Sequence, residues 1–188
     1  MSEQTLEAHV EAEACPHLAV FLRNEGELVG VLASFYALAV ARNGWLAHRS
    51  LPGGADHERA QLAEAGCDVA RLEADNQMVV VEMDFSAPAE GSARPWEPQL
   101  DDALRRGHTG LWYARFPVGG GPEYERMLGF ERDWHETFRG RPVVTLCPYI
   151  VGDLDGAATL ATLDDVAESH TGILLPRRDG RYGLLRPT

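Results

Sequence analysis

One acidic residue of this sequence, Glu131, falls on the apolar face of a predicted helix, where burying a charge costs free energy. The segment 121–140 has apolar residues at helical spacing, and Glu131 lies on the same face of the predicted helix. The other residues of that face are Tyr124, Met127, Leu128, then Trp134 or His135, and Phe138. An isolated buried carboxylate costs several kcal/mol, so the pattern predicts a cationic partner, either Arg115 or Arg23. Two interpretations stay open: a structural ion pair, or a charge network that closes on a ligand.

The turn Arg23-Asn24-Glu25 stands between the apolar run HLAVFL (17–22) and a helix predicted over 25–42. Nucleotide-binding α/β domains carry their glycine-rich phosphate loop at this place, but this turn has no such loop. Asn24 is a suitable residue to cap the helix. Arg23 and the helix amides could receive a polar or anionic ligand; the alternative is a surface arginine beside an ordinary cap.

The chain has no lysine, because all 17 of its Lys+Arg residues are arginine. A phosphate loop that ends in Gly-Lys-Ser/Thr, a Schiff-base lysine and a lysine general base are therefore excluded. The GxSxG and GxGxxG patterns of α/β hydrolases and dinucleotide-binding domains are also missing. These absences remove several classes of enzyme at once.

The histidines and cysteines show no metal-binding spacing. The HExxH zinc motif fails at 57–61 and at 135–139, where the second histidine is replaced in both cases. Cys15 and His17 could share an ion, but no third ligand lies near them in the sequence. Cys147 falls in a predicted apolar strand, where a buried, inert thiol is expected. The sequence therefore predicts neither a metal site nor a cofactor.

Size and charge limit the partners of this chain. Its 188 residues suit one domain with short tails. A net charge of −12 without a basic patch argues against direct binding of nucleic acid. The N-terminus has no secretory signal, and the longest apolar run, 28–41, is shorter than the roughly 20 residues that span a bilayer. We expect a cytoplasmic protein without a membrane partner.

Apolar runs and helical patterns alternate along the chain. Strands are predicted over 17–22, 44–50, 77–85, 109–116 and 142–150. Helices are predicted over 25–42, from a capping Asp56 to Gly66, and over 95–107, 121–140 and 156–169. The segment 172–186 is typical of a hairpin around Asp179-Gly180. This order predicts an α/β fold with a doubly wound, mostly parallel five-stranded sheet and a C-terminal hairpin extension.

Ligands of doubly wound folds bind beyond the carboxyl ends of the strands. Polar and aromatic side chains near those ends, and on the helices that follow them, make up the predicted ligand-binding set. Its members are Phe21, Arg23, Asn24, Glu27, Asp84, Arg115, Phe116, Glu131 and Tyr149. In this prediction the two arginines supply charge, Asn24 donates or accepts a hydrogen bond, and the three aromatic residues form apolar walls.

Three stretches resemble one known family, the MEDS domain, a sensory domain named for methanogens, methylotrophs and a dichloromethane-responsive regulator. They are HLAVFLRNEGELVGVLASFYALAVARNG, MLGFERDWHETFRGRPVVTLCPYI and ESHTGILL, within about 16–175. The resemblance rests on His17, the Arg23-Asn24 turn with Glu27, Glu131, and the end of the strand that carries Cys147 and Tyr149. It implies a fold similar to RecA and circadian-clock ATPase domains without the phosphate loop. It also implies a sensor of small molecules.

The resemblance implies division of the chain into an acidic tail (1–15), a sensory domain (16–175) and a C-terminal hairpin (176–188). Ala114-Arg115 replaces a Gly-Glu pair of the family, which predicts a different, more acidic ligand. Relatives are often joined to helix-turn-helix, histidine-kinase or anti-sigma-type modules, and none is recognised here. We therefore expect a non-catalytic sensor that acts through a signalling protein. A degenerate nucleotide-binding domain with Mg²⁺ at Asp84 and a purely structural dimerisation module are the alternatives.

Overall fold

The computed structural model describes Val10 and residues 16–84, 92–117, 122–152, 157–177 and 182–187. The strands of these segments are β1 (His17–Leu22), β2 (Trp45–Ser50), β3 (Met78–Glu82), β4 (Leu111–Arg115), β5 (Val143–Ile150), β6 (Gly172–Pro176) and β7 (Tyr182–Leu185). The helices are α2 (Glu25–Ala41), α3 (Ala55–Glu64), α4 (Val69–Ala74), the 3₁₀ turn η2 (Arg94–Trp96), α5 (Glu97–Arg105), α6 (Pro122–Phe138) and α7 (Ala157–Ala167).

The described strands form one sheet in the order β3-β2-β4-β5-β1-β6-β7. Neighbouring strands from β3 to β6 run parallel, and β7 pairs antiparallel with β6. The prediction of an α/β fold with a mostly parallel sheet is confirmed, and the five predicted strands are all present in it. The predicted hairpin is β6–β7, and it adds two strands to the sheet because β6 pairs directly with β1.

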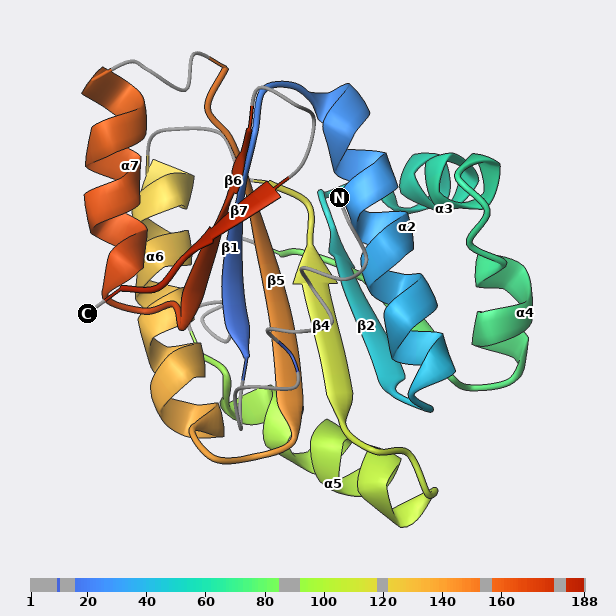
Figure 1. The fold of residues 1–188 in the computed structure, drawn as a ribbon. Helices are drawn as coiled ribbons and strands as arrows, with labels where there is room; N and C mark the ends of the chain where they lie inside the picture. The colour runs from blue at the N-terminus through green and yellow to red at the C-terminus, as the bar shows by residue number, and fades with distance from the viewer. Residues whose placement is uncertain are drawn as a thin grey trace.

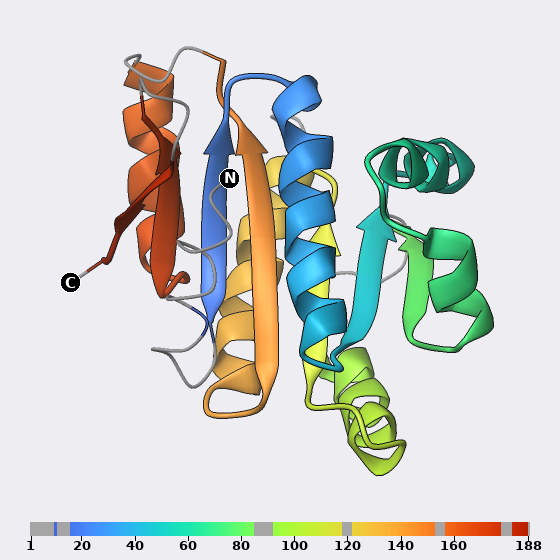
Figure 2. The ribbon, with the colours of Figure 1, turned by 45° about the vertical axis from the view of Figure 1, so that its right-hand side comes forward.

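Helices cover both faces of the sheet (Figures 1 and 2). The side chains of Leu18, Val20 and Leu22 on β1 pack in the cluster that includes residues of α2, α3 and α4. The alternate positions, Ala19 and Phe21, pack against α6 and α7. Since β1 is buried on both faces, each of its residues is apolar or enclosed, which explains the unbroken apolar run in the sequence.

Two local predictions need correction. Asp56 does not cap α3, because the helix begins at Ala55 with Gly54 at the N-cap; Asp56 pairs instead with Arg59 at 3.0 Å. The stretch between α3 and β3 contains α4, which was not predicted because six residues are too few to show a helical period. The turn expected at Asp179-Gly180 lies outside the described residues.

After the neighbouring strands β1 and β5, the chain continues toward opposite edges of the sheet. From β1 it passes through α2 to β2, beyond β5 and β4, whereas from β5 it passes through α7 to β6, on the other side of β1. α2 lies on one face and α7 on the other (Figure 2). In doubly wound folds such a reversal leaves a crevice at the carboxyl ends of the strands, where ligands bind. β1 and β5 therefore mark the edge of the sheet where a ligand site is expected.

Among the helices that the structure describes, none combines the length and the apolar character needed to cross a membrane.

Candidate functional site

Arg115 and Glu131 form a buried ion pair between the sheet and α6. Arg115 ends β4, and its guanidinium Nη2 donates a hydrogen bond to Glu131 Oε1. Their side chains are only 2% and 1% exposed. The sequence left two partners open for Glu131, and the structure identifies Arg115. The strand alternation explains this choice, because Leu111, Tyr113 and Arg115 project from the α6 face of β4.

Tyr149 completes the environment of the ion pair. Its hydroxyl donates to Glu131 Oε2, and the Arg115 guanidinium lies 5.5 Å from the centre of its ring. Burial raises the pKa of Glu131, but the charge of Arg115 and the hydrogen bonds from Tyr149 and Arg115 outweigh burial and hold that pKa below its usual value. Glu131 is therefore a carboxylate, and the network joins β4, α6 and β5 through one charged group.

Phe21 extends this network to β1. Its ring stacks on Tyr149 with the ring centres 5.7 Å apart. Four of the nine predicted ligand residues, Phe21, Arg115, Glu131 and Tyr149, therefore lie together on the α6 face, and all four are buried. Direct contact of a ligand with Arg115 or Glu131 would require the helix and the sheet to separate.

The start of α2 is capped by three residues that bond to one another, Arg23, Asn24 and Glu27. Asn24 Oδ1 accepts a hydrogen bond from Glu27 N at 3.1 Å, which confirms the predicted cap. Glu27 Oε2 accepts from Arg23 N at 2.9 Å, and Glu27 Oε1 pairs with Arg23 Nη1 at 3.1 Å. The helix amide and the arginine that were expected to face a ligand are thus already bonded within the cap.

A hollow of about 270 Å³ lies beside this cap. Its walls include Arg23, Glu27, Val31, Pro176 and Tyr182, so α2 forms one side and the β6–β7 hairpin the other. Burial and the nearby Glu27 raise the pKa of Tyr182 to about 12, which keeps its hydroxyl protonated. The hollow therefore presents a cation, a carboxylate and a neutral hydroxyl beside apolar surface.

The remaining two predicted residues lie apart from both groups. Phe116 packs edge-on against His48, with ring centres 5.7 Å apart, on the α2 face. Asp84 is exposed just after β3, which is the edge strand of the described sheet. The nine predicted residues therefore fall into a buried network, a helix cap and two separate positions, and their role in ligand binding stays a prediction.

A second buried network, which was not predicted, consists of Tyr36, His48 and Glu58. Tyr36 Oη lies 2.6 Å from His48 Nδ1, and His48 Nε2 lies 2.8 Å from Glu58 Oε2. Glu58 Oε1 also accepts from Leu51 N at 3.0 Å. The network ties α2, β2 and α3 together. A histidine inside the apolar run 45–50 was the only sequence signal, and its partners come from other elements.

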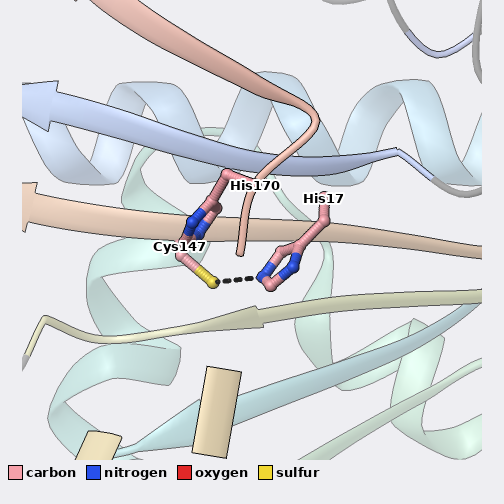
Figure 3. Close-up of side chains that lie close together, drawn as sticks. All are labelled: His17, Cys147 and His170. Atoms are coloured by element: carbon pink, nitrogen blue, oxygen red, sulfur yellow. Dashed lines mark hydrogen bonds between the residues drawn. The ribbon is translucent and has the colours of Figure 1, made fainter. Parts of the chain in front are cut away.

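His17, Cys147 and His170 form a third buried polar group, on the α6 and α7 side of the sheet. Figure 3 shows the three side chains side by side, from β1, β5 and the turn before β6. His17 Nε2 lies 3.4 Å from Cys147 Sγ, and the rings of His17 and His170 are centred 4.1 Å apart. One ligand atom from each residue lies within 4.8 Å of the other two. These residue types at this separation could hold a metal ion.

Burial sets the protonation of this group. Desolvation and the neighbouring Glu131 raise the pKa of the Cys147 thiol well above its usual value. Desolvation also lowers the pKa of His17 and of His170, so both imidazoles are neutral near pH 7. A thiol with a raised pKa is a poor nucleophile, which agrees with the expected inert thiol. The clustering of these three residues was not predicted, because Cys147 is 130 positions from His17 in the sequence.

These features define a class: a mostly parallel α/β domain whose strand order reverses between β1 and β5, and which has no phosphate loop. Within that class the chain belongs to the MEDS family. The family model described as the methanogen/methylotroph, DcmR sensory domain matches residues 16–171. This match confirms the resemblance found in the sequence and assigns the chain a sensory or signalling role. Comparison with curated proteins finds no match.

Proposed function

We propose that this MEDS domain is a non-catalytic sensor of a small polar organic molecule, which binds in the hollow between the start of α2 and the β6–β7 hairpin. The observation that carries the proposal is the position of this hollow next to the carboxyl end of β1, which is one of the two strands between which the strand order reverses. A volume of about 270 Å³ is near the lower limit of ligand pockets, so the ligand is small.

The chemistry of the hollow indicates what it would bind. Arg23 offers donors to a carboxylate or hydroxyl oxygen, while Glu27 accepts from a ligand hydroxyl. Val31 and Pro176 supply an apolar wall for a short carbon chain. A ligand carboxylate would compete with Glu27 for the Arg23 guanidinium. Opening this exposed pair costs little, because surface ion pairs contribute about 0–1 kcal/mol.

The signal would travel from the carboxyl end of β1 to α6. Phe21, two residues before Arg23, stacks on Tyr149, and Tyr149 donates to Glu131 on α6. A shift of the carboxyl end of β1 would therefore disturb Glu131. Among the α6 side chains that the structure describes, Glu131 is the buried acidic one, and it bonds to β4 and β5. A signalling protein, such as a kinase, an anti-sigma-type protein or a transcription regulator, would read the altered α6 surface.

The alternative, a degenerate nucleotide-binding domain, finds less support. Only two residues, Arg23 and Asn24, connect β1 to α2, whereas a phosphate loop needs about eight residues to surround a phosphate. Asp84, the expected Mg²⁺ ligand, follows β3, and three strands separate β3 from β1.

A thermal-shift screen of the full chain tests the proposal. The panel contains short carboxylic acids, hydroxy acids, alcohols, and ATP and ADP with Mg²⁺. A true ligand at a hundredfold excess over its dissociation constant should stabilise the fold by roughly 2.7 kcal/mol. Arg23→Ala and Tyr182→Phe should each remove the shift. Arg105→Ala, which breaks an exposed pair with Asp102 far from the hollow, is the matched control and should keep it.

Two results would contradict the proposal. Stabilisation by ATP with Mg²⁺ that Arg23→Ala abolishes would replace the sensor with a nucleotide-binding domain. A compound that stabilises Arg23→Ala and Tyr182→Phe as well as the wild-type chain would place the ligand elsewhere. Hydrogen exchange in the presence of the stabilising compound should show changed protection of α6, because Glu131 joins that helix to the sheet.

A further inference from the structure

We propose that His17, Cys147 and His170 bind one thiophilic d¹⁰ metal ion, Zn²⁺ or Cu⁺. This inference goes beyond the proposed function, because the group lies away from the hollow beside α2. His17 opens β1, Cys147 lies inside β5, and His170 lies two residues before the start of β6, so the ion would join three neighbouring strands of the sheet. A thiolate and two imidazoles are ligands that these ions favour.

The separation of the ligand atoms agrees with metal coordination. Zinc binds sulfur at about 2.3 Å and imidazole nitrogen at about 2.0 Å, so the two atoms lie about 3.5 Å apart in a tetrahedral site. The distance between His17 Nε2 and Cys147 Sγ is 3.4 Å. All three ligand atoms already fall within 4.8 Å of one another. Small changes of side-chain torsion would therefore complete the site.

His170 is held in the orientation of a metal ligand. Its Nδ1 lies 2.7 Å from the carbonyl oxygen of Val166 and 3.1 Å from Ser169 Oγ. A carbonyl can only accept, so Nδ1 carries the proton and Nε2 keeps a bare lone pair. A backbone carbonyl that fixes the far nitrogen is the usual support of a metal-binding histidine.

The bare nitrogen has no hydrogen-bond partner among the described residues. His170 is 4% exposed, and its Nε2 is a buried polar atom without such a bond. Buried polar atoms are nearly always hydrogen-bonded, so an exception calls for an explanation. A metal ion at this place would supply the missing partner for Nε2 and replace the weak contact between His17 and Cys147.

Charge distinguishes the two ions. Binding replaces the Cys147 thiol proton by the metal, and the proton leaves to solvent, so Cu⁺ leaves the buried charge unchanged and Zn²⁺ adds one positive charge. Arg115 and Glu131 cancel each other in both cases. Zn²⁺ prefers a fourth ligand, and Glu131 Oε2 lies 3.8 Å from His170 Nε2. Glu131 should therefore contribute to the affinity for Zn²⁺ and contribute much less to the affinity for Cu⁺.

The experiment uses the full chain with the Cys15→Ser substitution. Any bound metal is first removed with a chelator, and a reductant keeps the thiols reduced. Zn²⁺ and Cu⁺ affinities are measured by competition with chromophoric chelators, and stoichiometry by elemental analysis. We expect one ion per chain. Cys147→Ser and His170→Ala should weaken binding by at least about 100-fold, since even supporting residues cost 10–100-fold. Cys67→Ser and His57→Ala remove a thiol and an imidazole elsewhere and should leave the affinity unchanged.

Cobalt keeps the test decisive if a ligand variant fails to fold. Co²⁺ bound by Cys147 in the wild-type background should give a sulfur-to-metal charge-transfer band and tetrahedral visible bands, both displaced by Zn²⁺. A folded chain that shows neither band and binds neither Zn²⁺ nor Cu⁺ would overturn the proposal. Equal loss of affinity in Cys67→Ser or His57→Ala would do the same, because binding would then be non-specific.

Two further variants complete the test. Glu131→Gln should lower the Zn²⁺ affinity about tenfold or more and leave the Cu⁺ affinity within about threefold, by the ligand preferences described above. An equal loss for both ions would remove the assigned role of Glu131. Arg23→Ala should bind metal as the parent chain does, so failure of the small-molecule proposal and failure of this one are separate outcomes.

Discussion

Arg115 at the end of β4 and Glu131 in the middle of α6 form an ion pair that is closed off from solvent. Charged groups in such a place cost desolvation energy, and the Coulomb attraction seldom exceeds that cost. The pair is therefore poor as a source of stability. Its value lies in specifying how α6 sits on the sheet, since Glu131 also receives the Tyr149 hydroxyl of β5.

Removing one member of this pair should be much more harmful than removing both. We expect Arg115→Met to lower the free energy of unfolding by about 3–5 kcal/mol, because Glu131 is left as a buried charge. The double variant Arg115→Met, Glu131→Leu should regain most of that loss. Urea unfolding followed by circular dichroism measures both. As a control, Arg23→Ala breaks an exposed pair and should cost about 1 kcal/mol or less. Similar losses for Arg115→Met and Arg23→Ala would refute this account.

Asn24 should contribute as much to the stability of the fold as a typical helix N-cap does. Asn24→Ala removes the acceptor for Glu27 N and should lower the free energy of unfolding by about 1 kcal/mol. Asn24→Asp keeps the acceptor oxygen and adds a favourable charge at the helix start, so it should be close to neutral. Guanidinium unfolding of the three chains gives the comparison. A neutral Asn24→Ala would mean that the cap contributes nothing to α2.

The Tyr36-His48-Glu58 network should depend most on Glu58. Glu58→Ala leaves His48 Nε2 and Leu51 N without their acceptor, and each buried orphan costs about 1–3 kcal/mol. Tyr36→Phe removes one hydrogen bond at the other end and should cost about 1 kcal/mol. Thermal unfolding of both variants tests this order. Tyr36→Phe costing more than Glu58→Ala would show that His48 takes its main support from α2.

Cys67 should react slowly with alkylating reagents until the solution is alkaline. Burial, and then the neighbouring Asp68, raise the pKa of its thiol, while Arg71 opposes this shift. Only the thiolate is nucleophilic, so the alkylation rate should rise through a pH above the usual thiol value of about 8.5. Trypsin cuts after Arg59 and Arg71 and isolates Cys67 for mass spectrometry. A plateau reached at or below pH 8.5 would contradict the raised pKa; the urea-unfolded chain provides the reference curve.

Local sequence patterns were sufficient for most of the fold. The apolar runs of β1, β2, β4 and β5 and the capped helix α2 are signals carried by adjacent residues, and the structure agrees with them to within two residues. α4 was missed because six residues show no period, and α3 was given the wrong cap because Asp56 stands one residue inside the helix. The match over residues 16–171 then adds the family.

The candidate site was predictable only in part. The helical period placed Glu131 on a buried face and so required a cation, but it could not choose between Arg115 and Arg23. That choice depends on which face of β4 carries Arg115, and on Arg23 being bonded within its own helix cap. Asn24 was predictable as a cap because its acceptor and donor lie three residues apart.

The sequence by itself determined most of the elements of this protein, their alternation, the lack of a phosphate loop and the need to neutralise Glu131. Only the tertiary structure decided that Arg115 and Tyr149 meet Glu131, and that His17, Cys147 and His170 lie together. The physical reason is the strand order. β5, β1 and β6 are neighbours in the sheet although β5 and β1 are far apart in the chain, and no local pattern encodes which strands will pair.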